Sequence, residues 1–379
     1  MTARFATFPA VPGSRASLFA GSDQPARRSF GINVIAAGLD CVPVIVRDLA
    51  DTPFWTLVEF ARADALAAPS VLVVPPLSGH FPFLVRDLVL GLLQDFRVHV
   101  IDWTNVRHVP VRHGRFGFED NIAAIVEAIG LVGSGPAVIG ICQGGVPSLA
   151  ACAVLAAAED PNLPRSLTLI GAPIDPLANP TRVVNLVRGR PLSWFANGAT
   201  VRVLAPHAGR GRMVYPAQLQ LTALLAYLTR HINERGELLA KVNRDDGADP
   251  QRFPFLDLFT SIMDIDAAHF VENIEAVFHD CALRQGTLHY GGGRVDLRAL
   301  RRTALLTIEG ERDDVAAPGQ TSAAHRLCPD LPARLHRQVC VPQSGHFSLF
   351  HGAIFRRQVL PVLREFCARP PARAGQRVG

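Results

Sequence analysis

The chain has 379 residues, of which 49% are hydrophobic and 19% are charged, and its mean hydropathy is +0.20. This composition excludes a disordered or low-complexity protein, because such chains combine low hydrophobicity with high net charge. The formal net charge of +5 does not point to a nucleic-acid partner, because the arginines are spread along the whole sequence. No apolar run reaches the roughly 20 residues of a membrane span, so none is predicted.

The cysteines and the N-terminal segment indicate the compartment. The seven cysteines are scattered and odd in number, so the sequence predicts reduced, mostly buried thiols rather than a disulfide framework. The N-terminal segment contains arginines but no continuous apolar stretch of the kind a secretory signal needs. We therefore expect a cytoplasmic protein.

Short apolar runs are predicted to form the buried strands of one sheet, since each is too short for a helix and apolar throughout. They occupy residues 71–75, 98–102, 137–141, 166–170, 304–308 and 338–341. Helices are predicted between them at 81–94, 118–131 and 146–158, where apolar residues recur about every 3.6 positions. The alternation predicts an α/β fold with a doubly wound, mostly parallel sheet.

The alternation stops after Ile170 and resumes near Ala304. The stretch between contains helical runs at 218–228 and 270–278 and a turn at 291–293, which indicates a mainly helical cap inserted into the core. We predict an N-terminal extension (1–50), an α/β core (51–174 and 300–367), a cap or lid insertion (175–299) and a flexible tail (368–379).

A candidate nucleophile lies in the segment Gly140-Ile141-Cys142-Gln143-Gly144, between a predicted strand and a predicted helix. This is the setting of a nucleophile elbow, a strained strand-to-helix turn that needs small neighbours two residues on either side. The N-terminus of the following helix favours a thiolate. Because glycine-flanked cysteines also arise by chance, the alternative that Cys142 is only a small buried side chain stays open on this motif alone.

The partners of a cysteine nucleophile follow in the expected order. Asp313 and Asp314 come after the strand at 304–308, and His346 comes after the strand at 338–341. In an elbow-type enzyme an acid and then a histidine follow the later strands, the histidine as base and the acid as its orienting partner. The spacing from Gly310 favours Asp313 over Asp314 as the acid, and His346 is expected to accept the thiol proton.

The oxyanion hole is expected to use main-chain N–H groups. One is that of Gln143, next to the nucleophile, and the other lies in the loop after the strand at 71–75. Two prolines open that loop and cannot donate, so Leu77 or Ser78 is the earliest candidate. His80 is a weaker base candidate than His346 and is assigned to the substrate pocket instead.

The sequence lacks the motifs of several other kinds of functional site. No metal site is predicted, since no pair of cysteines at C-x₂-C spacing accompanies the histidines at 108 and 113. The absence of C-x-x-C and of a phosphate-binding P-loop argues against thioredoxin chemistry and nucleotide binding.

Several longer motifs carry a family resemblance. They are PLSGHF (76–81), DWTNVRHVP (102–110), GRFGFED (114–120), GAPID (171–175), YP (215–216) with QLT (220–222), RRTALLT (301–307) and EGERDD (309–314). Over roughly residues 50 to 365 the chain resembles the intracellular polyhydroxyalkanoate depolymerases.

The resemblance implies an α/β-hydrolase fold with a Cys142–His346–Asp313 triad. The implied activity is cleavage of ester bonds in stored poly(3-hydroxybutyrate) through an acyl-cysteine intermediate. We also expect Trp103, like His80, to line the substrate pocket. No cofactor is implied, although coenzyme A is an alternative to water as acyl acceptor. The implied partner is the surface of polyester granules, and no oligomeric state is predicted.

Two alternatives remain. The pair Gly144-Gly145 after the nucleophile is similar to polyhydroxyalkanoate synthases, which run related chemistry in the opposite direction from 3-hydroxyacyl-CoA. The other alternative is a non-catalytic granule-associated protein that keeps the fold.

Overall fold

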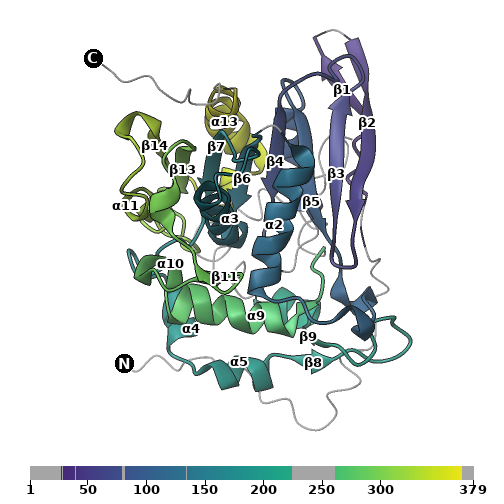
Figure 1. Ribbon diagram of the computed structural model, residues 1–379. Coiled ribbons are helices and arrows are strands. Elements are labelled where there is room, and N and C mark those ends of the chain that lie inside the picture. Colours follow the sequence, from purple (N-terminus) through teal and green to yellow (C-terminus); the bar gives the residue numbers. More distant parts are fainter. Residues whose placement is uncertain are drawn as a thin grey trace.

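Figure 1 shows the computed structural model, which describes residues 27, 29–38, 40–78, 82–133, 135–223 and 261–368. Nine of the described strands form one sheet in the order β1-β2-β3-β5-β4-β6-β7-β13-β14. From β5 to β14 neighbouring strands are parallel, whereas β1, β2 and β3 are antiparallel. Their bounds are β1 Val34–Ala37, β2 Asp40–Asp51, β3 Trp55–Arg62, β4 Ser70–Val74, β5 Arg97–Trp103, β6 Ala137–Ile141, β7 Ser166–Ile170, β13 Ala304–Gly310 and β14 His336–Val341.

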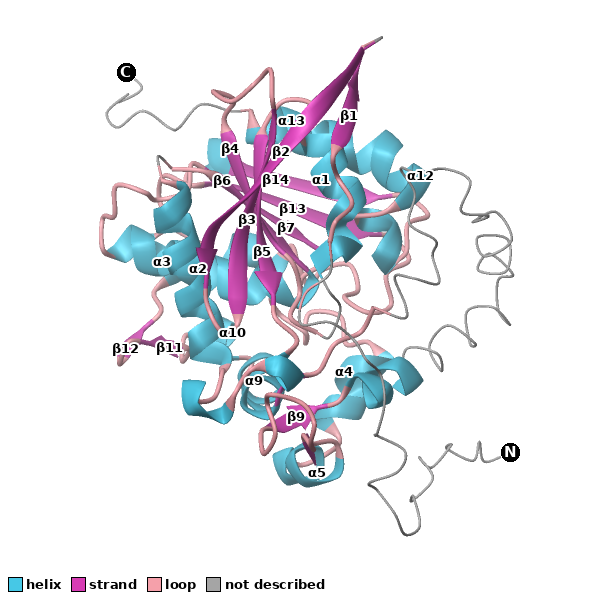
Figure 2. Cartoon of the chain, turned by 90° about the vertical axis from the view of Figure 1, so that its right-hand side faces the viewer, coloured by secondary structure: helices cyan, strands magenta, loops and turns pink. Residues whose placement is uncertain are grey.

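Helices cover both faces of the sheet, as Figure 2 shows. One face packs against α2 and α3, and the other against α1, α12 and α13. Helix α2 buries Ile122, Ile125 and Ile129 completely, and full burial of each such side chain contributes roughly 1.5–3 kcal/mol. The bounds are α1 Arg86–Leu92, α2 Phe118–Val132, α3 Gly145–Ala157, α11 Ala323–Leu327, α12 Gly352–Ile354 and α13 Leu360–Cys367.

The fold class predicted from the sequence is confirmed. Strands β4, β5, β6, β7, β13 and β14 coincide with the six predicted runs to within two residues at each end. The five core strands β4, β5, β6, β7 and β13 are buried almost along their whole length, which is why they are apolar throughout in the sequence. The predicted helices correspond to α1, with the short 3₁₀ helix before it, α2 and α3.

The sheet extends further toward the N-terminus than the sequence analysis expected. Strands β1 and β2 lie within the segment assigned to an N-terminal extension, and β3 follows it. Strand β2 is mostly exposed and therefore lacks a continuous apolar run, and polar Thr56 and Glu59 interrupt the apolar pattern of the buried strand β3. Of the predicted tail, residues 369–379 lie outside the described residues.

Smaller elements form a separate layer beyond the carboxyl ends of the parallel strands (Figures 1 and 2). Strands β8, β9 and β10 make a three-stranded antiparallel sheet, and β11 and β12 make a hairpin. The hairpin turn contains Gly291 and Gly292, both with positive φ as the predicted turn requires. The bounds are α4 Arg182–Arg188, α5 Leu192–Gly198, β8 Val201–Arg202, β9 Met213–Tyr215, β10 Ile265–Asp266, α9 Ala267–Asn273, a π-helix Ile274–His279, α10 Ala282–Gln285, β11 His289–Tyr290 and β12 Gly293–Arg294.

Both helical runs expected in this layer can be located. The run at 270–278 is formed by α9 and the π-helix that follows it. Residues 217–223 are helical, while the rest of the run at 218–228 lies outside the described residues. The division of the chain into core and cap stays a prediction.

Two buried ion pairs fasten this layer to the loop after β5. The Arg107 guanidinium donates to both carboxylate oxygens of Asp264, at 2.7 and 3.2 Å. Arg212 donates to Asp266 at 2.7 Å and to the carbonyl oxygens of Val109, at 3.0 Å, and other loop residues. All four charged side chains are almost completely buried. Charged groups in such positions are stable only when paired, so the pairs fix how the layer is attached.

Within the described part of the chain, no helix is both long enough and apolar enough to cross a lipid bilayer.

The Asp264 pair gives a prediction about stability. Replacing Asp264 with alanine leaves the buried Arg107 guanidinium without a counter-charge and should lower the free energy of unfolding by about 3–5 kcal/mol. The matched control is Asp330→Ala, which removes a carboxylate from the exposed Arg298 and Arg301 and should cost less than about 1 kcal/mol. Urea denaturation measures both, and equal losses in the two variants would contradict this account.

Candidate active site

Cys142 lies at the turn between β6 and α3. It opens a short 3₁₀ helix, Cys142–Gly144, that leads directly into α3, and its φ of +52° falls in the left-handed region. A non-glycine residue in that region costs free energy and is held there only by its surroundings. The Cys142 side chain is half-buried. The strand–turn–helix setting expected of a nucleophile elbow is therefore present.

Glycines make the turn sterically feasible. A Cβ on Gly144 would lie 2.7 Å from the carbonyl oxygen of Val74 and 2.9 Å from that of Pro75. A Cβ on Gly140 would lie 2.8 Å from the Cα of Gly145. Contacts this short do not occur at real Cβ atoms, so these positions exclude any side chain. The turn at Cys142 thus packs directly against the end of β4 and the loop after it.

His346 and Asp313 meet in the loops that follow β14 and β13. The Nδ1 atom of His346 lies 2.7 Å from Oδ2 of Asp313, and both side chains are buried. The other carboxylate oxygen accepts the N–H groups of Val315 and Ala316, each at 2.9 Å. The carboxylate that reaches His346 is thus that of Asp313, while its neighbour Asp314 is half-buried. This arrangement fixes the orientation of the imidazole and leaves Nε2 for a further contact.

Cys142 lies close enough to the imidazole to affect its pKa. Burial opposes a charge on His346, but the negative charges of Asp313 and Cys142 and the hydrogen bonds to both side chains outweigh it. Together they raise the pKa of His346 well above its ordinary value of 6.5. The structure therefore brings together the three residues that the sequence singled out, Cys142, Asp313 and His346.

Gly171, directly after β7, is a site residue that the sequence analysis missed. Its φ is +54°, and a Cβ at this position would lie 3.1 Å from Cε1 and 3.2 Å from Nδ1 of His346. The imidazole therefore packs against bare backbone, and Phe347 and Phe350 contact its ring edge-on. A glycine immediately after a buried strand was the signal in the sequence that could have identified it.

The loop that contains the candidate oxyanion donors follows β4. Leu77 is buried and Ser78 is half-buried, and neither N–H donates a hydrogen bond to another described residue. Gln143 is the second residue of the 3₁₀ helix that begins at Cys142. The close approach of Gly144 to the Val74 and Pro75 carbonyl oxygens brings this loop beside the turn at Cys142. His80 lies outside the described residues.

Trp103 supports this loop from within the core. It is completely buried at the end of β5, and its indole N–H donates to the carbonyl oxygen of Pro75 at 3.0 Å. Its ring contacts Phe116 edge-on. The indole therefore positions the start of the loop, and its expected place in the substrate pocket stays a prediction.

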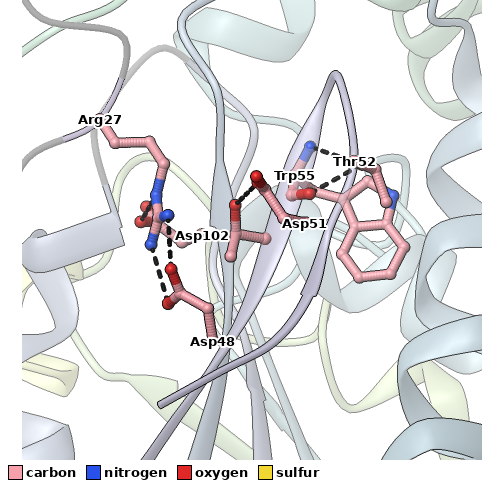
Figure 3. A network of polar contacts seen from close by, with 7 residues as sticks. Arg27, Asp48, Asp51, Thr52, Trp55 and Asp102 are labelled. Carbon is pink, nitrogen blue, oxygen red and sulfur yellow. Dashed lines mark hydrogen bonds and ion pairs between the residues drawn. The ribbon is translucent and has the colours of Figure 1, made fainter. Parts of the chain in front are cut away.

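Asp102 lies next to Trp103 and pairs with Arg27, which also reaches Asp48, as Figure 3 shows. Arg27 donates to Asp102 at 2.7 Å and also pairs with Asp48. Burial raises the pKa of Asp102 to about 6, although Arg27 opposes the shift. Among the described residues, none forms a hydrogen bond with Asp102 Oδ1. The network fastens the start of the described chain to the end of β5.

The other six cysteines lack the setting of Cys142. None of the seven forms a disulfide; Cys41 and Cys340 are exposed, and the rest apart from Cys142 are buried. Burial raises the pKa of Cys328 and Cys367 to about 12, which keeps these thiols protonated. A search of the described residues finds no cluster of three or more His, Cys, Asp or Glu side chains that could hold a metal ion.

The crowding at Gly144 predicts a strong effect of a single methyl group. Gly144→Ala should push the turn at Cys142 away from the loop after β4, and should lower stability and the ester hydrolysis that the resemblance implies. The control is Gly130→Ala in α2, where a Cβ would meet nothing within 4 Å, so stability should stay within about 1 kcal/mol of wild type or rise. Thermal unfolding measures the effect on stability, and hydrolysis of a soluble ester measures the effect on activity. A Gly144→Ala protein as stable and as active as wild type would contradict the crowding at this position.

The His346–Asp313 contact predicts a pH dependence. Because the folded-state pKa of His346 is raised, the pair stabilises the fold fully below pH 6.5 and the stabilisation is lost as pH rises through the folded pKa. In Asp313→Asn the pKa of His346 should fall, and the stability of the fold should depend less on pH. Histidine NMR titration of wild type and variant measures it, and an unchanged His346 pKa would contradict the assignment.

Comparison with solved structures shows the fold. A hydrolase from Pseudomonas aeruginosa PA01 is 15% identical, with a TM-score of 0.51 over 88% of this chain and 100% of that one. An enol-lactonase from Burkholderia xenovorans LB400 is 13% identical, with a TM-score of 0.47 over 83% of this chain and 97% of that one. The chain has the α/β-hydrolase fold.

Comparison with protein families is more specific. A search of curated proteins found no match. The model of a family described as "PHB de-polymerase C-terminus" matches residues 171–370, more than half of the chain. That segment includes β13, β14, Asp313 and His346. The chain therefore belongs to the PHB depolymerase family.

Proposed function

We propose that this protein cleaves the ester bonds of poly(3-hydroxyalkanoate), chiefly poly(3-hydroxybutyrate), through an acyl-cysteine intermediate. Membership of the PHB depolymerase family supports ester hydrolysis. The observation that carries the finer proposal is the 2.7 Å contact of His346 with Asp313, with Cys142 close enough to affect the pKa of the same imidazole, at the carboxyl ends of three parallel strands. Open α/β sheets bind their ligands at this edge.

The proposed first step forms a thioester. The Sγ atom of Cys142 attacks the carbonyl carbon of a 3-hydroxyacyl ester, and the negative charge that develops on oxygen is stabilised by the N–H of Gln143 together with that of Leu77 or Ser78. The C–O bond then breaks, and His346 donates its proton to the departing alkoxide, which leaves as the hydroxyl end of the polymer. Asp313 holds the imidazole in the orientation that both transfers require.

The second step releases the acyl group. His346, now neutral, accepts a proton from water as the oxygen attacks the thioester carbonyl, and the thiolate of Cys142 departs. The products are a shortened polymer and a free 3-hydroxy acid. The same step with the thiol of coenzyme A in place of water would yield an acyl-CoA. The chemistry needs no cofactor, and we propose that it occurs in the cytoplasm at the surface of polyester granules.

Substitutions of the three residues test the mechanism. Cys142→Ala should abolish degradation of amorphous polymer, and His346→Gln and Asp313→Asn should lower kcat by roughly 10³- to 10⁴-fold, as in other triads. Asp314→Asn is the matched control and should retain activity near that of wild type. A Cys142→Ala protein that still degrades polymer, or an Asp314→Asn variant more impaired than Asp313→Asn, would overturn the assignment.

The synthase reaction is the second candidate, because Gly144-Gly145 follows Gln143, a pattern similar to that of polyhydroxyalkanoate synthases. Incubating the protein with amorphous granules, with and without coenzyme A, and separately with 3-hydroxybutyryl-CoA distinguishes the two. Release of 3-hydroxy acid or its CoA ester from granules supports the depolymerase. Polymer formed from the CoA monomer supports the synthase, and granule binding without either reaction supports a non-catalytic granule protein.

A further inference from the structure

The layer of smaller elements beyond the carboxyl ends of the parallel strands is strongly basic at its outer end. Between Asp175 and Glu234 the sequence contains no acidic residue. The described part of this stretch has six arginines, of which only Arg212 is buried, paired with Asp266. The other five are exposed, and within the described chain none of them pairs with a carboxylate: Arg182, Arg188, Arg190, Arg202 and Arg210.

The same segment exposes large apolar side chains. Leu186 of α4 is 53% exposed and Trp194 of α5 is 41% exposed, and Val183, Leu204 and Met213 are exposed to a similar degree. Single exposed apolar residues are common on protein surfaces. Here they recur within one short segment, and a group of this kind is typical of an interaction surface.

The basic and apolar side chains are interleaved. Arg182 and Leu186 are one turn apart on α4, on the side away from the buried Val184. The Arg190 guanidinium lies 5.6 Å from the centre of the Trp194 ring.

A third pair lies on the small sheet, where Arg202 of β8 faces Met213 of β9 across the two strands. Figures 1 and 2 both show α4, α5 and the small sheet at the end of the molecule farthest from the large sheet. We call the three pairs the cap face: Arg182, Leu186, Arg190, Trp194, Arg202 and Met213.

We propose that the cap face docks the protein on an anionic lipid surface. Arginines whose charge no carboxylate neutralises are attracted to anionic headgroups, and each basic side chain near such a surface adds to the binding free energy. The apolar side chains enter the boundary between headgroups and acyl chains, where tryptophan is especially favourable. A purely basic surface would suit any soluble polyanion, whereas the interleaved pairs suit a partner that is both anionic and apolar.

This inference goes beyond the proposed function and does not depend on it. The cap face contains none of the residues assigned to the chemistry. Docking and hydrolysis of a soluble ester are therefore separable measurements, and failure of one leaves the other standing.

Vesicle binding of the full chain tests the proposal. The wild-type protein should co-sediment with vesicles of phosphatidylcholine and phosphatidylglycerol at least roughly tenfold more tightly than with phosphatidylcholine alone. Arg182→Glu/Arg190→Glu should lose most of this binding, because it reverses two charges at the cap face. Leu186→Gln/Trp194→Ser should weaken it as well, because the anchoring side chains are lost.

The matched control is Arg302→Glu/Arg334→Glu, which makes the same change in net charge at two exposed positions outside the cap face, just before β13 and β14. It should bind anionic vesicles like wild type, and all variants should hydrolyse a soluble ester normally, showing that they are folded. Equal binding to neutral and anionic vesicles, or equal loss in the control, would overturn the proposal.

Two further outcomes would assign the cap face to another partner and equally overturn the proposal. One is binding of short duplex DNA as tight as that of vesicles and insensitive to Leu186→Gln/Trp194→Ser. The other is a wild-type dimer in sedimentation that Arg182→Glu/Arg190→Glu converts to monomer.

Discussion

The turn at Cys142 is the constraint on which the rest of the site depends. It holds a cysteine in the left-handed region and brings the backbone of Gly144 against the end of β4, leaving no room for a side chain. The parallel strands on either side of β6 are buried and hydrogen-bonded along their length, so the strain is supported by a large part of the core. Cys142 is thus held at the end of a buried, fully paired strand.

The loops that complete the site are tied to that frame and to one another. The N–H of Arg312, in the loop after β13, donates to the carbonyl oxygen of Ser344 at 2.9 Å in the loop after β14. This bond keeps Asp313 and His346 in register with each other. Gly171 places backbone against one part of the imidazole, and the indole of Trp103 fixes the start of the loop opposite. Each loop is held by its own contacts, so the site is preorganised.

How far the sequence could predict this structure depends on the kind of signal. The central strands are buried on both faces and give continuous apolar runs, so their positions followed directly from the sequence. Strands β1 and β2 were missed because they are mostly exposed or short, which leaves no such pattern. The grouping of Cys142, Asp313 and His346 followed from chain order and strand ends. The roles of Gly171 and Trp103 did not, because they depend on which backbone atoms come close in three dimensions.

The cap face illustrates a different limit. Counted over the whole chain, the arginines look evenly spread, and the excess of basic residues is modest. Only the structure shows which arginines pair with carboxylates, as Arg107 and Arg212 do, and which remain exposed beside apolar side chains. Some of the apolar and basic residues counted in the composition therefore lie at the surface and form the cap face.

Mass spectrometry of the trapped intermediate tests the central claim most directly. Wild-type protein mixed with a soluble 3-hydroxybutyrate oligomer, quenched in acid during turnover and digested, should carry a 3-hydroxyacyl group on the peptide that contains Cys142. In Asp313→Asn the acyl group should form more slowly, and in Cys142→Ala it should not form on this peptide. Turnover without any acyl group on Cys142, or with the group on another residue, would contradict the account.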